Sequence, residues 1–173
     1  IVSGEDILAG YEDVKRSDWY QESVEYVTEK KLMNGMGDEK FNPNGSMTRG
    51  MLVTVLYRMS RSTYVGKSEF IDVSEFEYYS TAVAWATENE IVKGVGNNSF
   101  APDDEVTREQ LITILYRYAK YTNRTVRVIK KSNISKFEDY IEISEYSLEA
   151  FEWGYVEKII SGRSTTTLNP KGT

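Results

Sequence analysis

Residues 41–58 read FNPNGSMTRGMLVTVLYR, and residues 100–117 read FAPDDEVTREQLITILYR. The second stretch repeats the first 59 positions later, with a Phe-x-Pro loop end, a Thr-Arg step and an apolar run in each. Extending the comparison to residues 11–59 against 70–118 gives 17 identities in 49 ungapped pairs, where average residue usage would give roughly three. The chain is therefore built from a repeated unit, which determines its architecture.

A third copy begins at Phe137, and after one inserted residue it follows the second copy at a shift of 68. The position that would match Arg108 lies beyond Thr173, so we expect this copy to be incomplete. The predicted organisation is repeat 1 with its lead-in at residues 1–60, repeat 2 at 61–118, a basic connecting segment at 119–136 and a truncated repeat 3 at 137–173.

Each copy predicts two helices joined by a shaped loop. The first helix is expected to be capped by Ser17 or Asp18, to include Trp19 and to stop at Gly35 in a left-handed conformation, with its counterpart running from Tyr78 to Gly94. The second helix is expected to start at Thr48 and at Thr107, and Gln110 completes a capping box only in the later copy. Units of this size cannot bury their apolar stripes alone, so the copies should share a helical core.

Composition excludes many catalytic classes. The sequence contains neither Cys nor His, which removes thiolate and imidazole chemistry and the commonest metal ligands. We predict no metal, no cofactor and no enzyme activity. The formal net charge of -6 disfavours nucleic acid, and no apolar run is long enough for membrane insertion. The segment from Ala119 to Lys136 is an exception, because it carries six basic and no acidic residues; it is either a solvated connection or part of an anion site.

The ordered set of Asp-Val start, aromatic helix, Gly-x-Gly loop, Phe-x-Pro and Thr-Arg helix entry resembles the S-layer homology (SLH) repeat, from about Tyr11 to Thr173. The family pattern at the second helix is Thr-Arg-Ala-Glu, and this chain keeps only its Thr-Arg part. The resemblance implies an all-α fold of three tandem helix-loop-helix repeats in a pseudo-threefold spindle around a central helical bundle.

The resemblance also implies a function. SLH repeats are non-catalytic anchors that bind secondary cell wall polysaccharide on Gram-positive peptidoglycan, often through a pyruvylated terminal sugar. We therefore expect an extracellular protein of the cell wall or S-layer, with that polysaccharide and neighbouring surface-layer subunits as partners.

Candidate ligand-binding residues are those that recur at equivalent positions of the copies. An Arg at the first helical position adds its paired donors to a helix start, where unpaired N–H groups favour an anion. Aromatic faces suit a sugar, and glycines let backbone approach it. The set comprises Arg49, Arg108, Trp19, Tyr78, Gly35, Gly37, Gly94, Gly96, Asp13 and Asp72.

Structural roles remain open for the same residues. Trp19 and Tyr78 could be core aromatics, the two arginines could pair with Asp13 or Asp72, and the glycines could serve turn geometry. Arg58 and Arg117 are interpreted as packing or surface residues.

Two other functions remain as alternatives to the anchor. The first is a helical repeat scaffold for protein–protein interaction or S-layer self-assembly, which the 13 tyrosines keep open. The second is a glycosidase with a carboxylate pair, although no acidic pair stands out. The loop around Asn42 lacks the alternating acidic ligands of a calcium-binding EF-hand.

Overall fold

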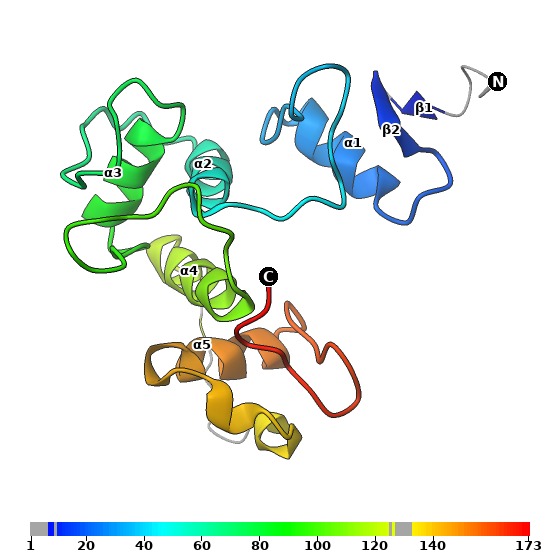
Figure 1. The fold of residues 1–173 in the computed structure, drawn as a ribbon, viewed down its shortest axis with the longest axis vertical. Helices are drawn as coiled ribbons and strands as arrows, with labels where there is room; N and C mark the ends of the chain where they lie inside the picture. Colours follow the sequence, from blue (N-terminus) through cyan, green and yellow to red (C-terminus); the bar gives the residue numbers. More distant parts are fainter. Residues whose placement is uncertain (1–6, 9, 125, 127–132) are drawn as a thin grey trace. The chain divides into compact units, whose positions relative to one another are not determined.

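The computed structural model describes residues 7–8, 10–124, 126 and 133–173. Helices dominate the described chain, and they form two compact units: residues 1–46 with 58–62, and residues 47–57 with 63–173. The division falls inside α2 (Arg49–Ser60), whose first part belongs to the core of the larger unit. Figure 1 labels these elements along the chain.

The smaller unit contains a short hairpin and one helix. Strand β1 (Ile7–Leu8) pairs antiparallel with β2 (Tyr11–Lys15), with Leu8 opposite Tyr11, and α1 (Gln21–Glu29) follows. Val14 and Val24 are buried, and Tyr11, Tyr20 and Phe41 pack against them. The core of this unit is therefore small.

The larger unit holds the other helices and two apolar clusters. These elements are α3 (Ser80–Glu88), α4 (Arg108–Tyr121), the short 3-10 helices η1 (Asn133–Lys136) and η2 (Tyr140–Glu142), and α5 (Glu145–Val156). One cluster joins α2, α3 and α4 around Val53, Val83 and Trp85, and the other joins α4 to α5 around Ile112 and Phe151. Helix α4 contributes to both clusters, and it packs beside α5 (Figure 1).

The first helix of each copy ends earlier than predicted. Helix α1 stops at Glu29 and α3 at Glu88, and the left-handed residues that follow are Lys31, with φ 55°, and Glu90, also with φ 55°. In each case the next N–H bonds back across the turn, Leu32 to the Val27 carbonyl and Ile91 to the Ala86 carbonyl, both at 2.8 Å. This is the Schellman arrangement. The predicted stop at Gly35 and Gly94 is therefore wrong.

The starts of these helices also differ from the prediction. Helix α1 has Tyr20 at its N-cap with no side-chain cap, and α3 has Tyr79 in the same role, so Trp19 and Tyr78 lie in the preceding turn. Asp18 does not cap the helix, because its carboxylate accepts the Lys15 N–H at 2.8 Å. The apolar periodicity predicts the presence of α1 and α3 correctly, but both helices are shorter at each end than it predicts.

The second helices begin as predicted. Thr107 accepts the Gln110 N–H and its own N–H bonds to the Gln110 side chain, so the capping box is closed at the start of α4. At the start of α2, Thr48 accepts the Met51 N–H at 3.2 Å, and Met51 has no group that could return the bond.

The predicted all-α class is confirmed for the described residues, with the small hairpin of β1 and β2 as an addition. The pseudo-threefold arrangement and the repeat boundaries stay predictions. Within the predicted basic segment, Arg127, Lys130 and Lys131 lie outside the described residues. Lys120 and Lys136 lie over aromatic rings, of Tyr116 at 4.1 Å and of Phe137 at 5.1 Å.

Candidate functional site

The aspartate at the start of each copy closes that copy's own loop. Asp72 accepts the N–H groups of Phe100 and Ala101, at 2.8 and 2.7 Å. Asp13 does the same for residues 41 and 42, and Asp139 for residues 168 and 169. Burial alone would raise the pKa of Asp72, but these backbone donors outweigh it and the pKa is lowered; the same holds for Asp13. Both carboxylates are thus occupied by structural bonds.

The arginine of each Thr-Arg step holds the loop of the following copy. Arg49 is buried, and its Nε donates to the Phe100 carbonyl at 2.9 Å while Nη2 donates to the Lys93 carbonyl at 3.2 Å. Arg108 repeats this pattern with the carbonyls of Leu168 and Ser161, at 2.8 and 2.6 Å. No ion pair joins either arginine to an aspartate within the described chain. Arg108 therefore holds the loop of the third copy in the same way that Arg49 holds the loop of the second.

The backbone donors at these helix starts are also occupied. The N–H of Arg49 bonds to the Asp104 carbonyl at 3.0 Å, and that of Gly50 bonds to the Pro102 carbonyl at 2.8 Å. The N–H groups of residues 108 and 109 bond likewise to the carbonyls of residues 172 and 170. The expectation that unpaired helix-start N–H groups attract the anion is therefore wrong, because the next copy's loop satisfies them.

The glycines shape the loop, as the alternative interpretation held. A Cβ on Gly94 would lie 2.6 Å from the Phe70 ring, and one on Gly35 would lie 2.7 Å from the Tyr11 ring. Gly37 and Gly96 have positive φ angles of 94° and 113°. The first glycine thus permits close packing on an aromatic residue, and the second permits the turn.

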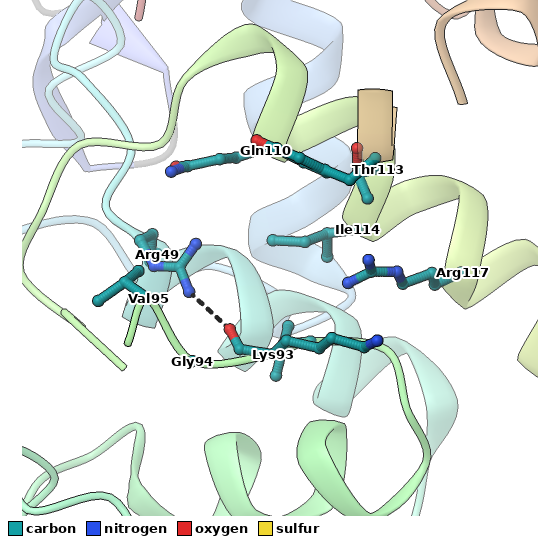
Figure 2. A pocket seen from close by; sticks show the side chains of 10 residues that line it. Arg49, Lys93, Gly94, Val95, Gln110, Thr113, Ile114 and Arg117 are labelled. Carbon is teal, nitrogen blue, oxygen red and sulfur yellow. Dashed lines mark hydrogen bonds between the residues drawn. The ribbon is translucent and has the colours of Figure 1, made fainter. Parts of the chain in front are cut away.

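One predicted arginine and one predicted glycine meet at a pocket of about 410 Å³. Its lining comes from three copies and consists of Arg49, Val92, Lys93, Gly94, Val95, Gln110, Thr113, Ile114, Arg117 and Tyr146. Figure 2 shows Arg49 beside the loop at Lys93, with α4 side chains across the cavity. Of the predicted site residues, only Arg49 and Gly94 line this pocket.

The pocket is cationic, although the chain is acidic. Arg49, Lys93 and Arg117 line it, and no Asp or Glu does. Burial lowers the pKa of Arg49 and of Arg117, yet an arginine stays charged at any physiological pH. The net charge of -6 is screened over about 8 Å at physiological salt, so local charge decides what the pocket attracts. Its chemistry suits an anion.

A buried carboxylate supports the wall of the pocket. Glu109 is 6% exposed, and it accepts the Tyr146 hydroxyl at 2.9 Å, the Ser144 N–H at 3.1 Å and the Lys171 Nζ at 2.8 Å. Burial and the bond to Glu109 raise the pKa of Tyr146 to about 12, so this hydroxyl remains a donor. Burial by itself would raise the pKa of Glu109, but its partners, above all Lys171, lower it. The ion pair also ties α4 to the third copy.

The predicted aromatic residues are not core residues. Trp19 is 92% exposed and packs edge-on against Tyr20, and Tyr78 is 59% exposed and packs the same way against Tyr79. Tyr78 does not line the pocket. The core interpretation is excluded for both, and their contact with sugar stays a prediction.

The sequence analysis missed Arg117 as a pocket residue. It matches Arg58, whose Nη1 donates to the Leu32 carbonyl at 2.8 Å, which is a packing role as predicted. Arg117 instead lines the pocket, and its guanidinium makes no hydrogen bond to another described residue. Its helical spacing to Gln110, Thr113 and Ile114 was a usable signal, because residues i, i+3, i+4 and i+7 share a helix face.

Two kinds of feature are absent from the part of the chain that the structure describes. No helix there has the length and hydropathy to cross a membrane. No cluster of three or more acidic, His or Cys side chains there could hold a metal ion.

Three features define a tandem helix-loop-helix repeat module: the aspartates that close their own loops, here called latches (Asp13, Asp72 and Asp139), the arginines that hold the next copy's loop, here called clamps (Arg49 and Arg108), and the cationic pocket. The family model for the S-layer homology domain matches residues 10–50 and 69–112. These two segments are S-layer homology domains, which confirms the resemblance.

Proteins with different names share the module. An amylopullulanase from Thermoanaerobacterium thermosulfurigenes is 27% identical over 167 residues, covering 94% of this chain and 8% of the relative. The surface-layer 125 kDa protein of Lysinibacillus sphaericus is 24% identical over 159 residues, covering 90% and 13%. A cellulosome-anchoring protein from Acetivibrio thermocellus is 27% identical over 125 residues, covering 66% and 27%. The chain thus spans less than a third of each relative's length.

Proposed function

We propose that this chain is a non-catalytic anchoring module that binds an acidic secondary cell wall polysaccharide on Gram-positive peptidoglycan. The pocket of Arg49, Lys93 and Arg117 carries the proposal, because it gathers three cationic side chains with no carboxylate in its lining. A pyruvylated terminal sugar supplies the matching group, one carboxylate fixed to a sugar ring.

The relatives support this function and an extracellular location. Those named as surface-layer and cellulosome-anchoring proteins resemble this chain about as closely as those named for enzymes. A module common to proteins with such different names is better explained by attachment than by a shared reaction.

The pocket offers each part of such a sugar a partner. The Nε and Nη2 atoms of Arg49 hold the loop, so its Nη1 edge is the part available to a carboxylate. Lys93 is exposed and adds a second donor, while Val92 and Ile114 provide apolar surface for the ring. Gly94 also lines the pocket beside them.

Calorimetry with purified wall polysaccharide, with and without its pyruvyl groups, tests the proposal. Removing Arg49 would also release the loop carbonyls that it holds, so Lys93→Gln is the sharper variant; it keeps the Lys93 carbonyl and loses only an exposed charge. We expect about fivefold weaker binding for Lys93→Gln and loss of measurable binding without pyruvate.

Lys30→Gln is the matched control, because Lys30 is an exposed lysine that does not line the pocket. It should bind like the wild type. If folded wild-type protein bound none of several wall polysaccharides, the anchor would be refuted and a protein-binding scaffold would become the better explanation.

A further inference from the structure

The pocket contains a second cationic position that the repeat pattern does not predict. Arg58 and Arg117 occupy equivalent places in their copies, yet they are used differently. Arg58 donates to the Leu32 carbonyl at 2.8 Å, whereas Arg117 lines the pocket and donates no hydrogen bond to the chain as described. A half-buried guanidinium that donates to no described residue carries a desolvation cost that a bound anion would offset.

Arg117 and Arg49 lie at opposite ends of the cavity. Figure 2 shows Arg49 and Arg117 on opposite sides of the pocket, with Ile114 between them. The pocket follows α4 from Gln110 to Arg117, which is about 10 Å along a helix axis at 1.5 Å per residue. A carboxylate bonded to one guanidinium lies about 2.8 Å from its nitrogens, so one such group cannot satisfy both ends.

Among the residues that line the pocket, none offers Arg117 a carboxylate. Tyr146 faces it from the third copy, but that hydroxyl donates to Glu109 and stays protonated because burial and this bond raise its pKa to about 12. Lys93 and Arg49 are the other charged residues of the lining, and both are cationic. The positive charge at this end therefore has no internal counterion in the pocket lining.

We propose that Arg117 is a specificity-determining residue that binds a second acidic group, so the preferred ligand carries two acidic groups on neighbouring sugars. The proposal rests on the anchoring function above and narrows its ligand class. Arg49 takes the first acidic group, and Arg117, toward whose side of the pocket the Lys93 side chain extends (Figure 2), takes the second.

Two synthetic disaccharides test this directly. Both carry one 4,6-pyruvyl ketal; in one the neighbouring sugar is glucose and in the other it is glucuronic acid, so they differ by one carboxylate. Calorimetry would compare wild type, Arg117→Gln and Arg117→Lys. We expect wild type to prefer the di-acidic disaccharide at least tenfold. Arg117→Gln should lose this preference, because its affinity for the di-acidic disaccharide falls much more than its affinity for the mono-acidic one, and Arg117→Lys should restore part of it.

Arg16→Gln serves as the charge-matched control, because Arg16 is exposed and does not line the pocket. It should keep the preference. Equal loss of affinity for both disaccharides in Arg117→Gln, or a wild-type preference under threefold, would overturn the role of Arg117 while leaving the anchor intact. Failure of wild type to bind either disaccharide or wall polysaccharide would overturn both proposals.

Discussion

At the residue scale, one aspartate per copy does structural work that its position at a repeat start does not reveal. Sequence comparison identified Asp13 and Asp72 as recurrent, and recurrence was interpreted as a sign of ligand contact. The structure places both carboxylates on backbone N–H groups 28 and 29 residues further on. A residue repeated in each copy can have a structural role or a binding role. For Asp13 and Asp72 the hydrogen-bond partners distinguish the two, because their carboxylates bond to the backbone of their own loops.

Asp72→Asn should lower the free energy of unfolding by about 1 to 2 kcal/mol at pH 7, because an amide forms weaker bonds to the two N–H groups than a carboxylate does. The pKa of Asp72 is lowered in the folded state, so its contribution is present above the unfolded pKa of 3.8 and is lost as pH falls through the folded value.

Urea unfolding at pH 7 and pH 3 measures both effects. The deficit of Asp72→Asn relative to wild type should shrink at pH 3, which lies below the unfolded pKa of 3.8, because protonation of this carboxyl in the unfolded chain reduces the stabilisation that the folded carboxylate contributes. An equal deficit at both pH values would contradict the latch. Glu75→Gln, an exposed neighbour paired with Lys67, should change stability by less than about 0.5 kcal/mol.

At the element scale, the helices could be predicted from apolar spacing, but their ends could not. The Thr107 capping box was predictable, since it needs only two residue types three positions apart. The Schellman turns were not, because Lys31 and Glu90 are not residues that usually mark a left-handed end. Glycine is the usual residue at such an end, but Gly35 and Gly94 lie further along the chain and instead allow the loop to pack against an aromatic residue.

Glu90→Gly tests this turn. Glycine adopts φ 55° without the steric cost that a glutamate pays there, so the free energy of unfolding should rise by about 0.5 kcal/mol after the greater freedom of glycine in the unfolded chain is counted. Glu88→Gly, at the exposed last residue of α3, should lower it by about 0.5 to 1 kcal/mol. Thermal unfolding distinguishes the two; a loss of stability in Glu90→Gly would show that the turn does not carry this strain.

The link between α4 and the third copy depends on a charge pair that the repeat pattern did not indicate. Glu109 stands where the first copy has Gly50, and Lys171 is its ion-pair partner at 2.8 Å. Glu109→Ala should cost about 2 to 4 kcal/mol, since it leaves the Tyr146 hydroxyl, the Ser144 N–H and the Lys171 ammonium without their acceptor.

Lys171→Ala should cost less, about 1 kcal/mol, because the lysine side chain is 51% exposed and solvent screens its charge. Chemical unfolding followed by tryptophan fluorescence measures which of the two variants loses more free energy of unfolding. Equal costs for Glu109→Ala and Lys171→Ala would mean that the ion pair alone, and not the whole set of bonds to Glu109, provides the stability.

At the scale of the whole molecule, apolar burial is uneven. Helix α1 has one buried residue, Val24, whereas α3 buries six, among them Val83 and Trp85. Opening a helix that buries little costs little. Amide hydrogen exchange should therefore be at least about tenfold faster in α1 than in α3, and similar protection in both helices would contradict this expectation.

Which site residues meet could not be predicted from one copy alone. The pocket takes Arg49 from the first copy, Lys93 and Arg117 from the second and Tyr146 from the third. Residues at equivalent positions of two copies can have different roles. Arg58 bonds to the Leu32 carbonyl, whereas Arg117 lines the pocket. The cationic character, by contrast, followed from the recurrent arginine.

The arginine clamps also bear on how such chains can be lengthened or recombined. Arg49 grips carbonyls of the second copy, and Arg108 grips carbonyls of the third, with the same atoms in the same roles. Each donor therefore fits the loop of any following copy. Duplication of one whole repeat adds an arginine donor and a set of loop carbonyl acceptors together. A recombination point between the arginine and the loop of the next copy would instead separate the donor from its acceptors. Gene rearrangements in register should therefore keep these hydrogen bonds, and those out of register should lose them.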